Sequence, residues 1–291
     1  MLLALATIWA GTFFAVEVAL RDVGPFTLVL GRTTMGALVL WGIVLLTATP
    51  RPQGLADWRD LAVMGFLNNA LPFSLIFWGQ TWITGGVASI LNAMTPIFAV
   101  AVAHVLTRDE RASPSKLAGM ALGVGGVAVL MGPAAVKGLG AGLPGQVAVL
   151  CAALSYSFAG VFGRRLRRMP ALVAAAGMLT ASSIMMLPVA LLVDGVPQAA
   201  PSTDTLIAWV FLGTACTALA YILYFRILAV AGATNLLLVT MLIPPGAIAL
   251  GAIFLGEPLD ARILGGFGLI LCGLLAVDGR VLELLRGRQP A

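Results

Sequence analysis

The sequence predicts an all-α membrane protein of ten transmembrane helices, arranged as two inverted five-helix repeats around a central cavity. The first observation is a series of ten apolar stretches of roughly 20 residues each. A helix rises 1.5 Å per residue, so each stretch can cross a hydrocarbon core about 30 Å thick. The second is composition, because 60% of the 291 residues are hydrophobic and only 10% are charged. A water-soluble protein of this size needs more charge to cover its surface.

In chain order the expected spans are residues 2–20, 26–47, 60–80, 86–106, 115–132, 144–163, 171–193, 205–226, 233–255 and 262–279. Charged, glycine or proline residues separate several of them, as in Pro50-Arg51-Pro52, Arg108-Asp109-Glu110-Arg111 and Asp194-Gly195. Such residues favour turns and are costly in a lipid-exposed helix interior.

The distribution of positive charge predicts the orientation of these spans. Of the 17 Lys and Arg residues, thirteen fall on one set of alternate connections and termini, three fall on the other set, and Arg32 lies within a span. The positive-inside rule places the rich side in the cytoplasm. We therefore expect a multi-pass protein of a bacterial inner (cell) membrane with both termini cytoplasmic. The net charge of +5 is then explained by topology and does not indicate a nucleic-acid partner.

A repeat appears when the sequence is offset by 147 residues, which is the third observation. The matching pairs are Gly85 with Gly232, Glu110 with Glu257, Gly119 with Gly266, and Gly126 with Gly273. Four matches at one offset, in the same span order, indicate duplication. The expected repeats are residues 1–139 and 140–291. Because each holds an odd number of spans, the second must enter the bilayer from the opposite side, as in many secondary transporters.

Prolines near the middle of two equivalent spans predict helix breaks. Pro96 lies in the fourth span, and Pro244 and Pro245 lie in the ninth. A proline removes a backbone hydrogen bond, which is tolerable in lipid only beside protein or a water-filled cavity. Paired breaks in inverted halves favour a binding site between them. The alternative is a pair of kinks that only shape the bundle.

Polar and aromatic residues near these breaks recur at helical spacing. Thr214, Thr217, Tyr221 and Tyr224 follow each other at steps of three, four and three, so they share one face of the eighth span. Such faces turn away from lipid, either to bind substrate or to hydrogen-bond other helices. The other candidates for lining the cavity are Trp9, Thr12, Phe13, Asn69, Phe73, Trp78, Gln80, Ser89, Asn92, Tyr156 and Asn235.

Two charged residues fall clearly within spans, Glu17 and Arg32. An isolated ion at the bilayer centre costs about 2.5–3.5 kcal/mol on insertion scales, so pairing is expected. The sequence therefore predicts a structural Glu17–Arg32 ion pair, with proton coupling through Glu17 as the alternative.

These residues carry a resemblance to a known family. The run Thr217–Tyr221, then Phe225-Arg226, Gly232-Ala233, the Pro244 break and Gly256-Glu257 resemble the EamA-type half of the drug/metabolite transporter superfamily. The first half agrees through Trp9–Phe13, Arg32 and Phe77-Trp78, although Asp109-Glu110-Arg111 lacks the usual preceding glycine. The resemblance implies two inverted five-helix repeats and a cavity lined by the first, third, fourth, sixth, eighth and ninth helices. It also suggests the YddG-like aromatic amino-acid exporters as a branch.

The function predicted from these features is secondary transport that exports small neutral or zwitterionic metabolites, most of all aromatic or apolar amino acids, by alternating access. The alternative is a proton-coupled drug or organic-cation exporter, which would need an essential intramembrane acid. An enzyme is not expected, since the sequence has no HExxH, GxSxG or GxxxxGK motif and only one histidine. The expected partners are a small-molecule substrate and the lipid bilayer, with no cofactor or metal, in a monomer or weak homodimer.

Overall fold

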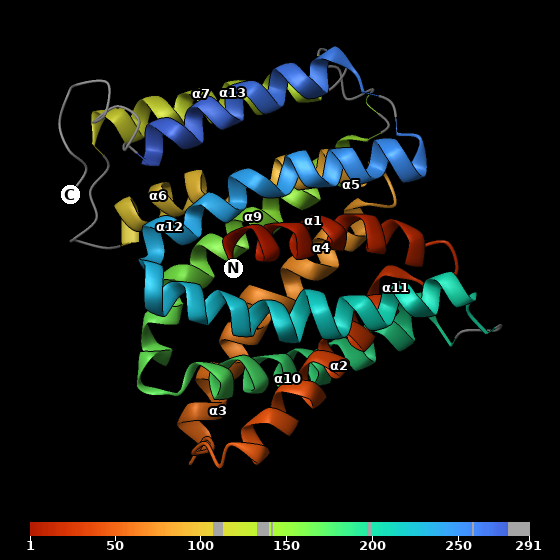
Figure 1. Ribbon diagram of the computed structural model, residues 1–291, viewed down its shortest axis with the longest axis vertical. Coiled ribbons are helices and arrows are strands. Elements are labelled where there is room, and N and C mark those ends of the chain that lie inside the picture. The colour runs from red at the N-terminus through yellow and green to blue at the C-terminus, as the bar shows by residue number, and fades with distance from the viewer. Residues whose placement is uncertain (107–112, 133–139, 141, 197–199, 258, 279–291) are drawn as a thin grey trace.

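The computed structural model describes residues 1–106, 113–132, 140, 142–196, 200–257 and 259–278, with the side chains of 232–238 also outside the description. Within these ranges the chain consists of helices joined by short connections and contains no strand. The helices run along the view of Figure 1 as a bundle, and α1 begins at the same end of the bundle at which α13 finishes. This placement agrees with an even number of crossings. The prediction of an all-α membrane fold is confirmed.

The first half of the chain contains α1 (Leu2–Ala19), α2 (Pro25–Leu46), α3 (Leu55–Gly65), η1 (Phe66–Ala70), α4 (Leu71–Gly79), α5 (Gly85–Asn92), α6 (Thr95–Leu106) and α7 (Pro114–Met131). The second half contains α9 (Leu143–Phe162), η2 (Gly163–Arg168), α10 (Ala171–Val189), η3 (Ala190–Asp194), α11 (Thr203–Gly213), η4 (Thr214–Leu219), α12 (Ala220–Leu250), η5 (Gly251–Leu255) and α13 (Ala261–Asp278). Of these, η1, η3, η4 and η5 are π-helical turns.

Hydroxyl side chains fix several helix starts, because the first N–H groups of a helix lack partners within it. Thr84 accepts a hydrogen bond from the Val87 amide at the start of α5, and Ser202 accepts one from the Thr205 amide at the start of α11. Asp22, in the connection after α1, accepts further bonds from the Ser202 amide and the Thr205 hydroxyl. The Ser202 hydroxyl also donates to Asp22. This bond first, then those of the Thr205 hydroxyl and the Ser202 amide, lower the pKa of Asp22 and tie two spans together outside the membrane.

Nine helical segments in the described ranges are long and apolar enough to cross a membrane, and a tenth, Val239–Leu255, is shorter. Together they correspond to the ten expected spans. The connection expected near residues 226–233 lies within α12, which is assigned as one helix from Ala220 to Leu250. The chain therefore passes from the eighth span into the ninth without leaving helical conformation.

Equivalent spans of the two halves pack against each other. The second span, α2, lies against α10, the seventh, and the fifth span, α7, lies against α13, the tenth (Figure 1). Glycines allow the latter contact, since a Cβ added at Gly119 would lie 2.6 Å from the Gly273 carbonyl oxygen. A Cβ at Gly126 would lie 2.7 Å from the Gly266 carbonyl oxygen. Close approach through small residues is typical of helix contacts in lipid.

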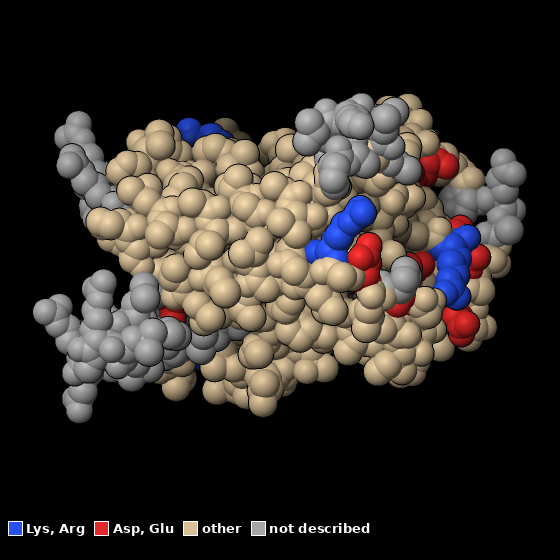
Figure 2. All heavy atoms as spheres, turned by 90° about the horizontal axis from the view of Figure 1, so that it is seen from above, with Lys and Arg blue, Asp and Glu red and all other residues tan. Residues whose placement is uncertain are grey.

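The outer surface of the bundle suits a lipid environment. Figure 2 shows a face on which a broad region is uncharged, while Lys, Arg, Asp and Glu gather toward one end. Large apolar side chains such as Leu46, Leu192 and Ile253 are exposed over most of their area. Such a surface would be unfavourable in water and is expected against hydrocarbon.

Candidate functional site

A cluster of polar and aromatic side chains connects the second, third and eighth spans. We call it the midspan cluster, and its members are Arg32, Asn68, Asn69, Phe73, Thr217 and Tyr221. The Tyr221 hydroxyl accepts hydrogen bonds from Asn68 Nδ2 at 3.0 Å and from Asn69 Nδ2 at 3.1 Å. The π turn η1 carries both amides, and η4 carries Thr217. Because π turns are rare and frequently lie at functional sites, their position supports a binding role.

Arg32 extends from α2 into this cluster. Its guanidinium carbon lies 3.9 Å from the centroid of the Phe73 ring. Arg32 Nε donates to Thr217 Oγ1 at 2.9 Å, and Arg32 Nη2 donates to the Cys216 carbonyl oxygen at 3.3 Å. The residue is only 4% exposed. Arg32 therefore carries its charge into the protein interior.

The expected ion pair between Glu17 and Arg32 does not form. Glu17 Oε2 instead accepts a hydrogen bond from the Gly85 amide at 3.0 Å, at the start of α5. The separation follows from the helix geometry, because the two side chains leave α1 and α2 toward different neighbours. Each finds partners there, Glu17 at a helix N-terminus and Arg32 among hydroxyl, carbonyl and aromatic groups.

The partner of Glu17 is a second carboxyl group, that of Glu257. Glu257 follows η5 and has the Glu17 carboxyl, the Thr84 hydroxyl and the Gly86 amide as its polar neighbours. Gly251 and Gly86 provide the space, since a Cβ at either would come within 3.0 Å of the Glu257 carboxyl group. Burial, then the hydrogen bond to Glu17 and its negative charge, raise the pKa of Glu257 to about 7. We call these two residues the carboxyl pair.

Several predicted residues lie beside the midspan cluster. The Trp9 ring contacts the Tyr224 ring with centroids 6.1 Å apart, and Tyr224 packs edge-on against Phe225 at 5.3 Å. Thr12 is buried beside Cys216. Tyr156 lies close enough to Arg32 to interact with it electrostatically. The first, third, sixth and eighth spans therefore contribute to one region.

Other predicted residues lie away from the cluster. Gln80 Nε2 donates to the Phe13 carbonyl oxygen at 2.9 Å, close to the carboxyl pair. Trp78 packs against Trp82, and Ser89 donates to the Gly86 carbonyl oxygen. No hydrogen bond or ring contact among the described residues joins the cluster to the side chains of Phe13, Trp78, Gln80, Ser89, Asn92 and Thr214. The side chain of Asn235 lies outside the described residues.

Three members of the region are absent from the sequence-based candidates: Asn68, Cys216 and Phe77. Asn68 shares the Tyr221 hydroxyl with Asn69, the Cys216 carbonyl accepts from Arg32, and the Phe77 ring lies 5.6 Å from the guanidinium carbon. Adjacent residues such as Asn68 and Asn69 normally face different directions on an α-helix, so periodicity favoured only one of them. The π turn brings both amides within reach of one hydroxyl.

The two proline positions behave differently. The fourth span is interrupted at Ala93 and Met94, directly before Pro96 in the first turn of α6. The expected break at Pro244 and Pro245 is wrong, because α12 continues through both residues. A proline removes one hydrogen bond and can bend a helix without ending it when neighbouring groups supply the missing contacts.

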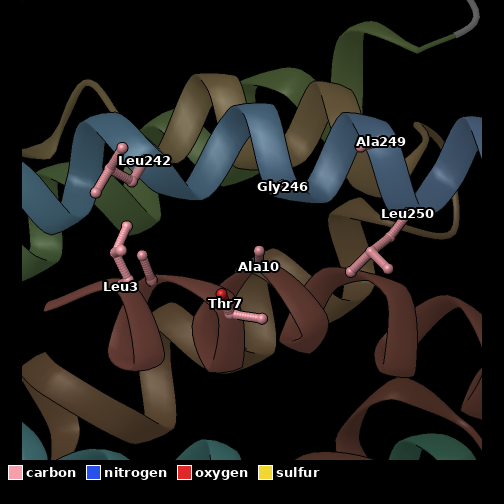
Figure 3. A pocket seen from close by; sticks show the side chains of 8 residues that line it. Leu3, Thr7, Ala10, Leu242, Gly246, Ala249 and Leu250 are labelled. Carbon is pink, nitrogen blue, oxygen red and sulfur yellow. The ribbon is translucent and has the colours of Figure 1, made fainter. Parts of the chain in front are cut away.

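A groove lies between α1 and α12 (Figure 3). It has a volume of about 310 Å³ and is lined by Leu3, Ala6, Thr7, Ala10, Leu242, Gly246, Ala249 and Leu250. Its lining is apolar except for the Thr7 hydroxyl. Within the midspan cluster, Asn69 is fully buried and Thr217 is 1% exposed, while Asn68 and Tyr221 are partly exposed.

Tyr221→Phe is expected to destabilise the protein by about 1–3 kcal/mol. The substitution removes the hydroxyl that accepts hydrogen bonds from Asn68 and Asn69. Both side-chain amides then lose this partner. The melting temperature of the detergent-solubilised protein measures the effect. Tyr224→Phe is the matched control, because the Tyr224 hydroxyl makes no hydrogen bond to a described residue and its ring contacts would remain. Equal losses in the two variants would contradict the assignment.

The comparisons with known proteins agree with this architecture. The model of the EamA-like transporter family matches the chain twice, at residues 1–132 and 143–277. A solved crystal structure superposes with a TM-score of 0.67 at 22% identity, covering 98% of this chain and 96% of that one. At this identity the likeness shows the fold alone.

Relatives in other organisms are named as transporters. A probable terminal-alkyne amino-acid exporter of Streptantibioticus cattleyicolor is 27% identical over 94% of this chain and 91% of its own length. A probable amino-acid metabolite efflux pump of Salmonella typhimurium is 26% identical over 94% of this chain and 91% of its own. YoaV of Bacillus subtilis, an uncharacterized transporter, is 23% identical over 94% of both chains. The double match to one family model over almost the whole chain shows that this protein belongs to the EamA-like transporter family.

Proposed function

We propose that this protein exports small neutral or zwitterionic metabolites, most of all amino acids with aromatic or apolar side chains, by alternating access. The observation that carries the proposal is the chemistry of the midspan cluster. It combines amide and hydroxyl groups of Asn68, Asn69 and Tyr221 with the aromatic ring of Phe73, close to the Trp9–Tyr224 pair. Aromatic rings suit an apolar side chain, and hydrogen-bonding groups suit the polar ends of an amino acid.

Two relatives with amino-acid substrates in their names support the same class of substrate. A zwitterion also carries no net charge across the membrane potential, so its export needs little electrical work. Alternating access is supported by the double match to one family model, because inverted repeats move relative to one another around a central site in many secondary transporters.

The second candidate, a proton-coupled drug or organic-cation exporter, is favoured by the carboxyl pair. Glu257 has a pKa raised to about 7 beside Glu17, and a group that titrates near neutral pH can bind and release protons during transport. The pair lies near the start of α5, however, and no Asp or Glu among the described residues makes a hydrogen bond or ion pair to the midspan cluster. A cation substrate held in the cluster would lack an acidic partner.

Counterflow in proteoliposomes tests the proposal. Vesicles that contain the purified protein and unlabelled phenylalanine, methionine or threonine are expected to accumulate the labelled amino acid, with saturation, and without any imposed gradient. Protein-free vesicles and vesicles with heat-denatured protein provide the background. Exchange of an organic cation such as tetraphenylphosphonium, with no exchange of any amino acid, would contradict the proposal and establish the second candidate.

A further inference from the structure

The guanidinium of Arg32 has one edge bound to the protein and one edge free of described partners. Nε and Nη2 donate to Thr217 Oγ1 and to the Cys216 carbonyl oxygen, and these two bonds occupy the Nε/Nη2 edge. Nη1 makes no hydrogen bond to a described residue. The face of the group rests on the Phe73 ring at 3.9 Å, which fixes the plane of the fork. The Nη1/Nη2 edge of the guanidinium is therefore held in a fixed orientation. Apart from the Nη2 bond to Cys216, the N–H groups along this edge make no described hydrogen bond.

No carboxylate in the described part of the chain compensates the Arg32 charge. The titratable groups close enough to act on it are Cys216, Tyr156 and Tyr221, a thiol and two phenols that are ordinarily uncharged at neutral pH. The described acid of the same membrane region, Glu17, is bound at the start of α5. A buried cation at 4% exposure without an anion is unfavourable, and an anionic group from outside the chain would relieve it.

A buried acceptor lies near this cation and is also without a partner. Asn69 is fully buried, its Nδ2 donates to Tyr221, and its Oδ1 has no hydrogen-bond partner. Asn69 precedes Phe73 by one helical turn, so both side chains lie on the same side of the third span. Phe73 thus contacts the Arg32 guanidinium and lies one turn from Asn69 along the third span.

We propose that Arg32 binds the carboxylate of the transported molecule through its Nη1/Nη2 edge, while Asn69 Oδ1 accepts a hydrogen bond from the ammonium group. This inference rests on the amino-acid export proposed above, and it names the residue that distinguishes carboxylate-bearing substrates from amines. A planar guanidinium matches a carboxylate in a bidentate arrangement, which an ammonium group of lysine cannot reproduce. The aromatic surface of Phe73 holds that arrangement in place and excludes water.

The test uses two analogues of phenylalanine that each keep one of its charged groups. 3-Phenylpropanoate keeps the carboxylate and lacks the amine, while phenethylamine keeps the amine and lacks the carboxylate. Both are used as competitors of labelled phenylalanine in counterflow by wild-type protein and by Arg32→Gln. The variant is expected to raise the half-inhibitory concentration of 3-phenylpropanoate by about 10–100-fold and to leave that of phenethylamine unchanged. A purely structural role would weaken both competitors alike and would overturn the inference.

Thr33→Val is the matched control, because Thr33 is the next residue of α2, is fully buried and contacts Ser183 on α10 instead of the cluster. It should leave the ratio of the two inhibitory concentrations unchanged. Arg32→Lys should retain charge but lose most of the bidentate preference, giving an intermediate ratio. If Thr33→Val changed the ratio of the two inhibitory concentrations as Arg32→Gln does, a specific role for Arg32 would be contradicted.

A second measurement separates failure of this inference from failure of the proposed function. Thermal stabilisation of the detergent-solubilised protein by 3-phenylpropanoate reports binding without transport. If wild-type protein exchanges no amino acid, the export proposal fails. Stabilisation by 3-phenylpropanoate that disappears in Arg32→Gln would still support a carboxylate site. Equal stabilisation of both proteins, or of neither, would overturn it.

Discussion

Gly273→Val is expected to force α13 away from α7 and to lower the melting temperature by about 10 °C, from a loss of about 3 kcal/mol. A Cβ at Gly273 would lie 2.6 Å from the Gly119 carbonyl oxygen and 2.9 Å from the Gly123 amide nitrogen. Both atoms belong to the backbone of α7, so no side-chain rotation can relieve the clash. Fluorescence-detected size-exclusion after heating of the solubilised protein would measure the loss.

Gly268→Val on the same helix is the control for this prediction. An added Cβ at Gly268 meets nothing within 4 Å, because this position faces away from α7. The control shares the loss of glycine and the gain of a β-branched side chain, so any difference comes from the helix contact. A Gly273→Val protein as stable as Gly268→Val would show that the two helices do not touch as described.

Glu257→Gln is expected to abolish most of the pH dependence of stability between about pH 5 and pH 7.5. The pKa of Glu257 is raised to about 7 by burial, then by the hydrogen bond and charge of Glu17. The folded protein therefore holds a proton that the unfolded chain releases above its ordinary pKa near 4.5. Since the folded state binds more protons in this window, the free energy of unfolding falls as pH rises through it. Wild-type protein should accordingly melt at a higher temperature at the lower pH.

The amide of the variant resembles the protonated carboxyl, so its melting temperature should stay nearly constant and exceed that of the wild type near pH 8. Asp260→Asn is the control, because Asp260 belongs to the same connection but bonds the Arg262 amide instead of Glu17. The only titratable group described as acting on Glu257 is Glu17. A Glu257→Gln protein that is less stable than the wild type near pH 8 would contradict the conclusion that folded Glu257 holds a proton beside Glu17.

Much of the fold follows from hydropathy and spacing. The expected spans agree with the described helices because a bilayer requires long apolar stretches whose backbone bonds are satisfied internally. Of the residues expected to turn away from lipid, Asn69, Phe73 and Thr217 are buried, and Tyr221 is partly exposed. The glycines that matched at the 147-residue offset, Gly119 with Gly266 and Gly126 with Gly273, lie where α7 and α13 come close together.

Periodicity failed where the helix itself changes. The π turn η4 begins at Thr214, and a π turn holds one residue more than an α turn. The Thr214 side chain therefore does not share a face with Thr217 and Tyr221. Its hydroxyl donates a hydrogen bond to the Val210 carbonyl oxygen. Long-range pairing also could not be read from spacing, since Glu17 and Glu257 come from opposite ends of the chain. The 147-residue offset matched Glu257 with Glu110 and so indicated that Glu257 belongs to the repeat. It did not indicate that Glu257 pairs with Glu17.

The positions of η1 and η4 bear on the history of the molecule. Residues 66–70 correspond at the 147-residue offset to residues 213–217, and η4 occupies Thr214–Leu219. A π turn forms when one residue is inserted into an existing helix without disturbing the contacts on either side. Both halves carry a π turn at nearly the same place of an equivalent span, as duplication of one five-helix unit that already contained the turn would produce.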